Sequence, residues 1–383
     1  MKVCMITSLH SPKDDRIFYK QAKSLQNNGF DVSILCLADD NGKFKDMSGN
    51  VLNAKNESQI EADGIKIICI KKQSSLFQKI LHKFAKGKCW DNFIKKAIEI
   101  NAEVYHAHEP QTAFIGLKIQ SHTKAKLIYD AHEPWIFSRS LKEGLLKILC
   151  LSKLKNIITA NQITQQTLLK ENPKLNTEVI YNCSPSFFIQ YRKENKDIII
   201  CHEGALWFNR GLKLIVEALI ILKTTYPNFK FRIIGDVFGK EKVYLLDKIK
   251  EYNLQENIEI TGWLAYKDVP KSLAECSIGI ITNTDEERNT LAGPPNKLFN
   301  YMTLGLAIIS VDLPATTQII RETNCGIILE KREVQLLAEK LKDLLGDNTK
   351  RKDLQEKSSE ASNKKYNWES EADKLFQFYR SLK

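Results

Sequence analysis

Short runs of hydrophobic residues alternate along the chain with longer stretches in which hydrophobic residues recur at helical spacing. This alternation is typical of parallel β-sheets whose strands are joined by crossover helices. In the first half, the runs that predict strands are Lys2–Thr7, Val32–Leu37, Ile65–Ile70, Glu103–His106, Lys126–Tyr129 and Ile157–Thr159. Helices are predicted at Ile17–Asn28, which Gly29 ends, and at Thr112–Gln120. The polar stretch Asp39–Glu61 predicts a long loop or an irregular insertion.

An irregular stretch, Asn182–Lys196, interrupts this pattern, which then begins again. In the second half, the runs that predict strands are Ile198–Cys201, Phe231–Ile234, Ile258–Ile260, Ile278–Thr282, Ala307–Val311 and Ile327–Leu329. Helices such as Leu212–Thr224 lie between them. We therefore expect an α/β protein with two doubly wound domains, 1–185 and 186–366, that face each other across a cleft. In such sheets, ligands bind beyond the carboxyl ends of the strands, where the strand order reverses.

The composition suits a soluble protein of this kind. The chain has 383 residues, 43% of them hydrophobic and 27% charged, which is long for a single core. No hydrophobic run approaches the roughly 20 residues that a membrane-spanning helix needs, and the first residues do not resemble a signal peptide. Nine cysteines without a C-x-x-C pair suit reduced, mostly buried thiols. We therefore expect a cytoplasmic protein.

The formal net charge of +11 indicates an acidic partner: nucleic acid, an anionic membrane surface or a phosphorylated ligand. No aromatic and basic recognition motif accompanies the charge, so nucleic acid is not the expected partner. The segment Lys66–Lys96 has nine lysines and one acid, Asp91, and its hydrophobic residues between Phe77 and Phe84 follow helical spacing. It is either a domain helix with a solvated basic face or a helix on anionic lipid, where each basic residue contributes about 1 kcal/mol.

A lysine follows two prolines in the sequence PPNKLFNYMTLG. Pro294 and Pro295 suit the beginning of a helix and Gly305 suits its end, so Lys297 is expected in the first turn. A cation there is unfavourable by roughly 0.3–1 kcal/mol, whereas the exposed amides of this turn attract anions. Taken alone, Lys297 is most simply a solvent-exposed side chain. A bound phosphate would make the position favourable.

A second cation marks a helix start in the sequence IIICHEGALWFNRGLKLIVEAL. The predicted strand ends at Cys201, a loop with Gly204 follows, and Arg210 and Gly211 precede the helix. Glycine lets the backbone approach a ligand closely, and the guanidinium group suits phosphate. The segment matches neither the G-x-G-x-x-G nor the P-loop pattern. Two helix starts marked by cations therefore predict a diphosphate site.

Several segments of the chain together resemble a known family. GALWFNRGLKLIVEAL, FKFRIIGD, IEITGWLAYKDVPKSLAECSIGI and PPNKLFNYMTLGLAIISVDLPATTQII resemble, in this order, the donor half of retaining glycosyltransferases of group 1 (family 4). The opening MKVCMITSLHSPKDDRIFYKQAKSLQNNGFDVSILC and the pair YHAHEP and LIYDAHEPW resemble their acceptor half. The resemblance implies the GT-B architecture of two Rossmann-like domains. The C-terminal domain would bind the nucleotide-sugar and the N-terminal one the acceptor, with a last helix, about 367–383, packed back on the N-terminal domain.

The resemblance also implies roles for individual residues. Arg210 and Lys297 would hold the diphosphate and His132 would lie near the reacting sugar, which makes these three the candidate catalytic residues. The candidate donor-binding residues are Gly204, Gly211, Trp263, Leu264, Pro295, Asn296 and Asn300. No cofactor is implied, because the nucleotide-sugar is a substrate.

The chain departs from the family pattern at two places. Many relatives have an arginine after the first donor-loop glycine, where this chain has Ala205. Relatives typically carry two glutamates eight positions apart around the helix; here these positions fall near Ala292 and on Asn300, which cannot supply a carboxylate. Cations and helix-end amides would stabilise the leaving diphosphate without a metal ion. No D-x-D sequence suggests a divalent ion held by carboxylates.

Two His-Glu-Pro triplets begin at His108 and His132, each after a predicted strand. His108, Glu109 and Glu133 are expected first of all to contact the acceptor. A structural role is the second interpretation, and zinc bound by the two histidines and two glutamates is the third. For His106, within its strand, we expect a structural role.

The segment HSPKDDRIF takes the place of a glycine-rich loop found in many relatives. Asp15 is expected to cap the helix that begins near Ile17. His10 and Arg16 are further candidates for acceptor contacts.

The expected function is that of a metal-independent, retaining hexosyltransferase in cell-surface polysaccharide synthesis. It would move a sugar from a nucleotide-sugar, with UDP favoured over GDP, to a glycan or a polyprenyl-linked glycan. A nucleotide-sugar 2-epimerase of the same architecture is one alternative, and a catalytically weak partner subunit, suggested by Ala205 and Asn300, is another. Peripheral binding to the inner face of the membrane would use Lys66–Lys96.

Overall fold

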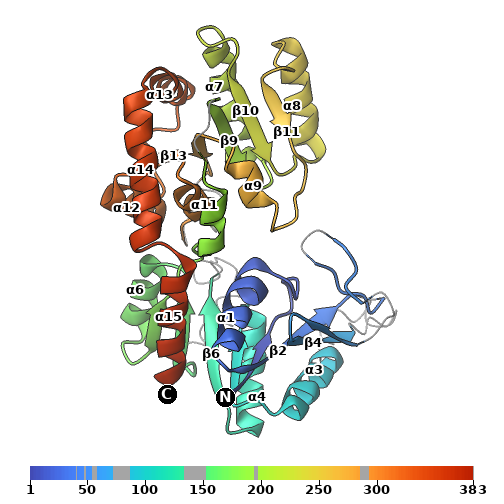
Figure 1. Ribbon diagram of the computed structural model, residues 1–383. Coiled ribbons are helices and arrows are strands. Elements are labelled where there is room, and N and C mark those ends of the chain that lie inside the picture. The colour runs from blue at the N-terminus through green and yellow to red at the C-terminus, as the bar shows by residue number, and fades with distance from the viewer. Residues whose placement is uncertain are drawn as a thin grey trace. The chain divides into compact units, whose positions relative to one another are not determined.

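The computed structural model describes residues 1–39, 41–46, 49–53, 58–71, 87–132, 152–193, 197–284 and 293–382. They form two compact units, which we call unit 1 (residues 1–180 with 372–383) and unit 2 (residues 181–371). The boundary between Ile180 and Tyr181 lies near the predicted one at residue 185. Helix α15 (Trp368–Arg380) begins in unit 2 and ends in unit 1 (Figure 1).

Unit 1 contains an eight-stranded sheet with the order β3-β4-β2-β1-β5-β6-β7-β8. Its strands are β1 (Lys2–Ile6), β2 (Asp31–Ala38), β3 (Gln59–Ala62), β4 (Ile65–Lys71), β5 (Val104–Ala107), β6 (Lys126–Ala131), β7 (Asn156–Thr159) and β8 (Asn176–Val179). All neighbouring strands are parallel except β3, which runs antiparallel to β4. The strand order reverses between β1 and β5, which is where the fold favours a ligand site.

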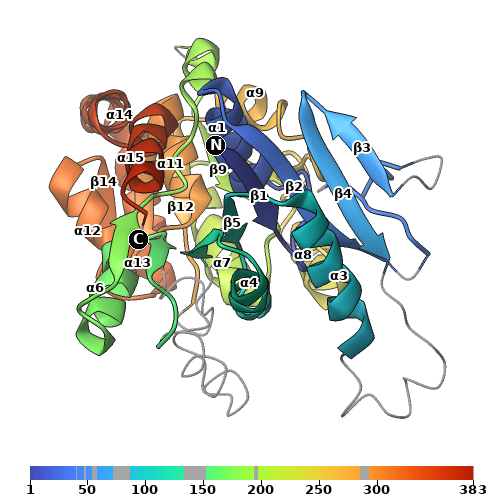
Figure 2. The ribbon, with the colours of Figure 1, turned by 90° about the horizontal axis from the view of Figure 1, so that it is seen from below.

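Helices cover both faces of this sheet. They are η1 (Asp15–Ala22), α1 (Lys23–Asn27), α3 (Gly87–Ile100), α4 (Pro110–His122), α6 (Gln162–Glu171) and part of α15. Figure 2 shows α3 and α4 on one face and α1 on the other. Strands β5 and β7 are buried along their whole length, as expected for a parallel sheet between two helical layers.

The sequence pattern missed two strands, β3 and β8. Strand β3 overlaps the end of the stretch predicted as a loop, so that prediction is wrong for residues 59–61. Both strands are short and lie at the edges of the sheet, and two or three of their four residues are polar. An edge strand with one solvated face has no continuous hydrophobic run, and therefore the pattern cannot reveal it.

Unit 2 contains a six-stranded sheet with the order β11-β10-β9-β12-β13-β14, in which all neighbours are parallel. Its strands are β9 (Ile199–Glu203), β10 (Lys230–Ile234), β11 (Ile258–Ile260), β12 (Ile278–Ile281), β13 (Ala307–Val311) and β14 (Gly326–Leu329). Each overlaps one of the runs predicted as strands. The strand order reverses between β9 and β12.

The helices of unit 2 follow the strands in the alternation that the sequence predicts. They are η3 (Ser186–Tyr191), η4 (Phe208–Arg210), α7 (Leu212–Lys223), α8 (Gly239–Glu251), α9 (Val269–Leu273), α11 (Asn296–Leu304), α12 (Pro314–Thr323), α13 (Val334–Gly346) and α14 (Asn348–Lys364). A single hydrophobic core joins them to the sheet. Helix α11 begins directly after Pro295 and ends at Gly305, as predicted.

Gly211 lets α7 begin close to the end of β12. Its φ angle is +91°, and a Cβ atom at this position would lie 2.6 Å from the backbone oxygen of Thr282. The Thr282 hydroxyl in turn donates a hydrogen bond of 2.8 Å to the backbone oxygen of Arg210. Any larger residue at 211 would therefore push Arg210 and α7 away from the carboxyl end of β12.

We predict that Gly211→Ala lowers the free energy of unfolding by about 2–4 kcal/mol, from the left-handed backbone and from the overlap with Thr282. Gly239→Ala is the matched control, because its φ angle is +55° and no atom lies within 4 Å of its Cβ position. The control should lose only about 1 kcal/mol. Urea denaturation of both variants tests the prediction, and equal losses would contradict it.

Candidate functional site

The candidate nucleotide site of unit 2 lies at the carboxyl ends of β9 and β12, where the strand order reverses. Strand β9 ends in His202 and Glu203, and the loop that follows leads through η4 to α7. Helix α11 begins near the same sheet edge, and its Tyr301 hydroxyl accepts a hydrogen bond of 2.9 Å from the backbone nitrogen of Glu203. Two segments far apart in the sequence thus meet there: β9 with the loop that follows it, and α11.

The simplest interpretation of Lys297, a solvent-exposed side chain, is wrong. Lys297 is 7% exposed, and its Nζ atom lies 3.2 Å from Nε2 of His202, which is fully buried. Burial, and next the positive charges of Lys297 and Arg210, lower the pKa of His202 well below its usual value. His202 is therefore neutral and can accept a hydrogen bond from the ammonium group. Both cations lie close enough to His202 to influence it.

Arg210 ends η4, and Gly211 separates it from the first residue of α7. Its Nη1 atom donates to the backbone oxygen of Ala205 at 3.3 Å, so the guanidinium group lies along the loop that begins at Gly204. Gly204 has a φ angle of +92°, and a Cβ atom there would be 3.7 Å from Nη1 of Arg210. The guanidinium group is therefore held beside backbone that is free of side-chain bulk.

The other predicted donor-binding residues lie at the same ends of the strands and on α11. Trp263 and Leu264 follow β11, and the Trp263 side chain is 50% exposed. Pro295 has an extended backbone and directly precedes α11. Asn296 is the first residue of α11, and its side-chain oxygen accepts a hydrogen bond of 2.9 Å from Asn182. The unit therefore presents one edge with two cations, an exposed indole ring and a helix start.

Asn300 makes a network that the sequence does not predict. Its Nδ2 atom donates to Oε1 of Glu203 at 2.7 Å, and its Oδ1 atom accepts a hydrogen bond from the Ser184 hydroxyl. His202, Glu203 and Ser184 were all missed. For His202 and Glu203, the available signal was their position at the end of a buried strand, directly before the glycine of the donor loop.

In unit 1, polar side chains gather at the carboxyl ends of β5 and β6 around Asp130, which is fully buried. Asp130 accepts hydrogen bonds from Nε and Nη2 of Arg16 at 2.8 and 2.9 Å, and from Gln21 at 2.7 Å. Burial alone would raise the pKa of Asp130, but Arg16 and His132 outweigh it and hold the pKa well below its usual value. Asp130 is therefore an anion paired with Arg16.

Segment η1, expected to be part of one α-helix, is a π-helix, in which residues five apart lie on one side. Arg16 and Gln21 are five apart and both reach Asp130. Its cap is also one residue earlier than predicted. Asp14, not Asp15, accepts from the backbone nitrogens of Arg16 and Ile17, because the helix already begins at Asp15.

Three predicted acceptor contacts are buried in the structure. Arg16 is 3% exposed and bonded to Asp130, and His108 is fully buried. Glu109 is also fully buried and accepts hydrogen bonds from the Thr7 hydroxyl and from the backbone nitrogens of Ser8, Leu9 and His10. Glu109 therefore shapes the loop after β1, and none of the three side chains is placed to contact an acceptor directly. Glu133 lies outside the described residues.

His10 and His132 form a pair, since their Nε2 atoms are 3.2 Å apart. One ring must donate and the other accept, so the pair holds a single proton between these two atoms. Nδ1 of His132 lies 3.6 Å from Oδ1 of Asp130. Burial would lower the pKa of His132, but Asp130 outweighs burial and raises it. This pair can hold or move a proton at the end of β6.

One member of the zinc set expected from the sequence, Glu133, lies outside the described residues, so that interpretation stays a prediction. A different group of metal-binding residue types lies in this cluster. Nitrogen atoms of His106 and His108 and an oxygen of Asp130 lie within 4.8 Å of one another. However, both oxygens of Asp130 already accept from Arg16, and one also from Gln21, so a cation would have to displace the guanidinium group. His106 has a structural contact instead: its Nδ1 atom lies 2.9 Å from the Tyr379 hydroxyl of α15.

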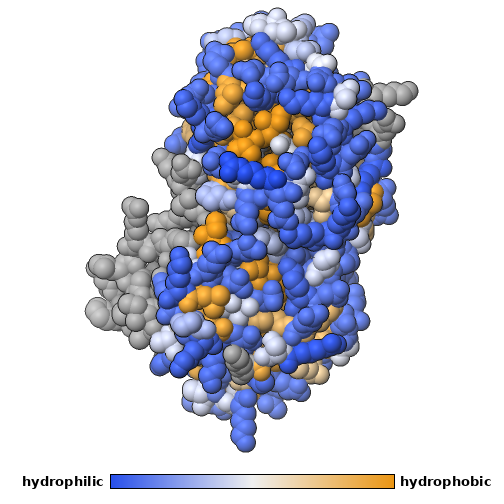
Figure 3. Space-filling view, turned by 90° about the vertical axis from the view of Figure 1, so that its left-hand side faces the viewer, coloured by the Kyte–Doolittle hydropathy of each residue, from blue (hydrophilic) through white to orange (hydrophobic). Residues whose placement is uncertain are grey.

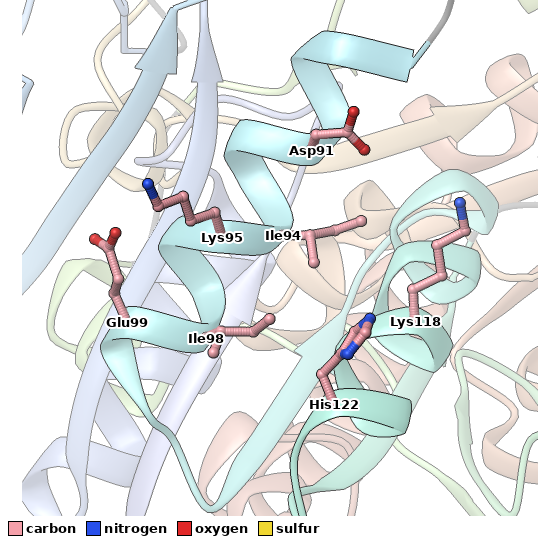
Figure 4. Close-up of a pocket in the computed structure, with 7 residues that line it drawn as sticks. All are labelled: Asp91, Ile94, Lys95, Ile98, Glu99, Lys118 and His122. Atoms are coloured by element: carbon pink, nitrogen blue, oxygen red, sulfur yellow. The ribbon is translucent and has the colours of Figure 1, made fainter.

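A pocket of about 710 Å³ lies elsewhere in unit 1, between α3 and α4 (Figure 4). Ile94 and Ile98 point from α3 toward α4, and charged residues such as Lys95 and Lys118 are also among those that line the pocket. Its lining residues on α4, Lys118 and His122, lie in the last turns of that helix, remote from the carboxyl ends of the strands. This pocket is not part of either cluster.

Comparison with known proteins agrees with the geometry of unit 2. Residues 184–361 match the family described as glycosyl transferases group 1. The matched residues lie within unit 2, which contains the candidate nucleotide site. Over its whole length, the chain has the GT-B fold. It is similar to sucrose-phosphate synthase of Thermosynechococcus elongatus (TM-score 0.75, 13% identity, 99% of this chain and 98% of that one). HepE of Anabaena in complex with UDP is also similar (TM-score 0.77, 16% identity, 100% of both chains).

Curated relatives match over part of the GT-B chain. An uncharacterized glycosyltransferase, MJ1178 of Methanocaldococcus jannaschii, is 25% identical over 227 residues, which are 58% of this chain and 56% of that protein. The amylovoran biosynthesis glycosyltransferase AmsD of Erwinia amylovora is 24% identical over 231 residues, 57% of this chain and 60% of that protein. The chain thus spans little more than half the length of these relatives.

The buried histidines predict that the protein loses stability in mild acid. Burial lowers the pKa of His106 from 6.5 to about 4, and the pKa values of His108 and His202 are also well below their usual values. Below pH 6.5 the unfolded chain therefore binds more protons than the folded one, and the free energy of unfolding falls as the pH approaches 4. His106 alone accounts for roughly 3 kcal/mol.

Urea denaturation between pH 7.5 and 4.5 measures this effect. His106→Gln should show a shallower pH dependence than the wild type, whereas His122→Gln, on the exposed end of α4, should keep the wild-type dependence. An equally steep dependence in His106→Gln would contradict the assignment.

Proposed function

We propose that the protein is a retaining glycosyltransferase that moves a sugar from a nucleotide-sugar to a glycan or lipid-linked glycan acceptor. The observation that carries this proposal is the placement of Arg210 and Lys297 at one edge of unit 2, both close to the neutral His202. Two cations beside a helix start suit a diphosphate, which carries two or more negative charges.

The chemistry follows from the charge that develops on the leaving group. As the bond between sugar and diphosphate breaks, Arg210 and Lys297 stabilise the negative charge on the nucleoside diphosphate. An acceptor hydroxyl attacks from the face that the diphosphate leaves, and its proton passes to that diphosphate. His132 positions the sugar or buffers the charge, with Asp130 and His10 setting its protonation. Cations of the chain thereby do the work of a metal ion.

The donor and acceptor are proposed from the relatives. HepE, which shares the fold, has been solved with UDP and with UDP-glucose, which favours a UDP-sugar donor. Two relatives, AmsD and AmsK, act in amylovoran biosynthesis, which favours a cell-surface polysaccharide. A third, 25% identical over 121 residues, is the chitobiosyldiphosphodolichol beta-mannosyltransferase of Candida albicans, whose name describes a lipid-linked acceptor.

We also propose that the protein works in the cytoplasm at the inner face of the membrane. None of the helices that the structure describes has the length and apolar character needed to cross a bilayer. The face seen in Figure 3 is mainly hydrophilic, with hydrophobic residues in small separate areas. Residues 72–86 of the basic segment Lys66–Lys96 lie outside the described part of the chain, so its contact with anionic lipid stays a prediction, and liposome sedimentation tests it.

A thermal-shift screen of nucleoside diphosphates, followed by product analysis with sugars of the best nucleotide, tests the proposed function. A transferase forms a new glycoside only when an acceptor is present. Turnover of the donor alone would indicate the 2-epimerase instead. Nucleotide binding without turnover would favour the weak partner subunit that Ala205 and Asn300 suggest.

We predict that Arg210→Ala and Lys297→Ala each weaken the binding of UDP by ~1.5–3 kcal/mol, the range for hydrogen bonds to charged groups. Lys213→Ala is the control, because Lys213 is an exposed cation near the start of α7 whose ammonium group lies 5.2 Å from the centre of the Phe208 ring. It should bind UDP like the wild type. Calorimetry that finds unchanged affinity in both site variants would reject the diphosphate site.

His132→Ala should lower kcat more than it lowers donor affinity, because the proposed role of His132 concerns the reacting sugar and not the nucleotide. Steady-state kinetics with a UDP-sugar, combined with calorimetry of UDP, separates the two effects. His122→Ala, which removes an exposed histidine of the same unit, is the control. Full turnover in His132→Ala would show that the wrong histidine was assigned.

A further inference from the structure

The carboxylate of Glu203 lies beside Asn300 on α11. The resemblance to group 1 glycosyltransferases implies a glutamate at the position of Asn300, and an amide supplies no negative charge. Oε1 of Glu203, at the end of β9, accepts a hydrogen bond of 2.7 Å from Nδ2 of Asn300. The negative charge that α11 lacks is therefore present within hydrogen-bond distance of Asn300, but on the neighbouring strand.

The structure holds both partners of this pair in place. The Ser184 hydroxyl donates to Oδ1 of Asn300, so the amide is oriented with its Nδ2 atom toward Glu203. The backbone nitrogen of Glu203 donates to the hydroxyl of Tyr301, which is fully buried on α11. Two consecutive residues of α11 thus position Glu203. Asn300 bonds to the side chain of Glu203, and the hydroxyl of Tyr301 bonds to its backbone.

The pair also belongs to the same edge as the two cations. Glu203 directly follows His202, which approaches Lys297, and it directly precedes Gly204 of the loop along which Arg210 lies. Lys297 and Asn300 are three residues apart on α11 and so share one side of that helix. Because the Asn300 amide bonds to Ser184 and Glu203, Asn300 is better placed to position the carboxylate than to bind a ligand itself.

We propose that Glu203 is the carboxylate of the nucleotide-sugar site and binds a hydroxyl group of the donor, with Asn300 as its positioning residue. An ionised carboxylate accepts several hydrogen bonds and donates none, which suits the hydroxyls of a ribose or a sugar ring. It can hold the Asn300 amide and a ligand hydroxyl together. This inference rests on the proposed function, because it presumes that the site binds a nucleotide-sugar.

Calorimetry with UDP, 2′,3′-dideoxy-UDP and UDP-glucose tests the proposal on wild-type protein, Glu203→Gln, Asn300→Glu and the double variant Glu203→Gln/Asn300→Glu. Glu203→Gln should weaken the binding of UDP-glucose at least about 10-fold, the lower end of the range for a hydrogen bond to a charged group. Asn300→Glu should also weaken binding, because two carboxylates would lie side by side. The double variant restores one carboxylate and one amide in exchanged positions, and should return to within about 3-fold of the wild type.

The ligands separate the two sources of the hydroxyl. If Glu203 binds the ribose, Glu203→Gln weakens UDP and UDP-glucose equally and no longer prefers UDP to 2′,3′-dideoxy-UDP. If it binds the sugar, only UDP-glucose is weakened. Glu256→Gln, an exposed glutamate of unit 2, is the control and should bind all three ligands like the wild type.

Two further results have distinct meanings. Wild-type affinity of Glu203→Gln for UDP and for UDP-glucose would overturn the role of Glu203 and leave the proposed function standing. Failure of the wild type itself to bind UDP, UDP-glucose or the GDP counterparts would overturn the proposed function, and this inference with it. Thermal unfolding of each variant without ligand shows that a loss of binding is not a loss of folding, and the double variant tests the pair even where one single variant is unstable.

Discussion

The burial of a cation at the start of α11 is the constraint on which unit 2 depends. Lys297 is held there against two costs: removal of an ammonium group from water, and the positive end of the helix dipole. The group that approaches it, His202, is kept neutral by burial and by the charges of Lys297 and Arg210. A dianionic ligand would offset both costs at once, and this is the physical reason for proposing a diphosphate site at this edge.

Unit 1 buries an anion and pairs it within the protein. Its buried anion, Asp130, is neutralised inside the protein by Arg16, and Gln21 occupies a further acceptor position. Asp130 also acts on the histidines around it, since it raises the pKa of His132, whereas burial lowers the pKa values of His106 and His108. The π-helix η1 makes the pairing possible, because its wider turn brings residues five apart to the same side.

The sequence could place those candidate site residues whose positions depend on the ends of helices and strands. The placement of Arg210 and Lys297 at two helix starts could be predicted, because glycine and proline mark these starts in the sequence. Arg16, His108 and Glu109 could not be interpreted correctly, because a charged residue after a strand has the same appearance whether it faces solvent or a buried partner. Glu203 was missed for a related reason: its role depends on Asn300, a residue 97 positions away in the chain.

By itself, the sequence determined the two doubly wound sheets, the positions of nearly all central strands and the helix starts that carry Arg210 and Lys297. These features depend on the spacing of hydrophobic residues and on local glycine and proline, which act over a few residues of chain. Only the tertiary structure decided which side chains are buried and which charges are paired. Burial changes the free energy of a charge by several kcal/mol, and the partners that compensate it come from strands and helices far apart in the sequence.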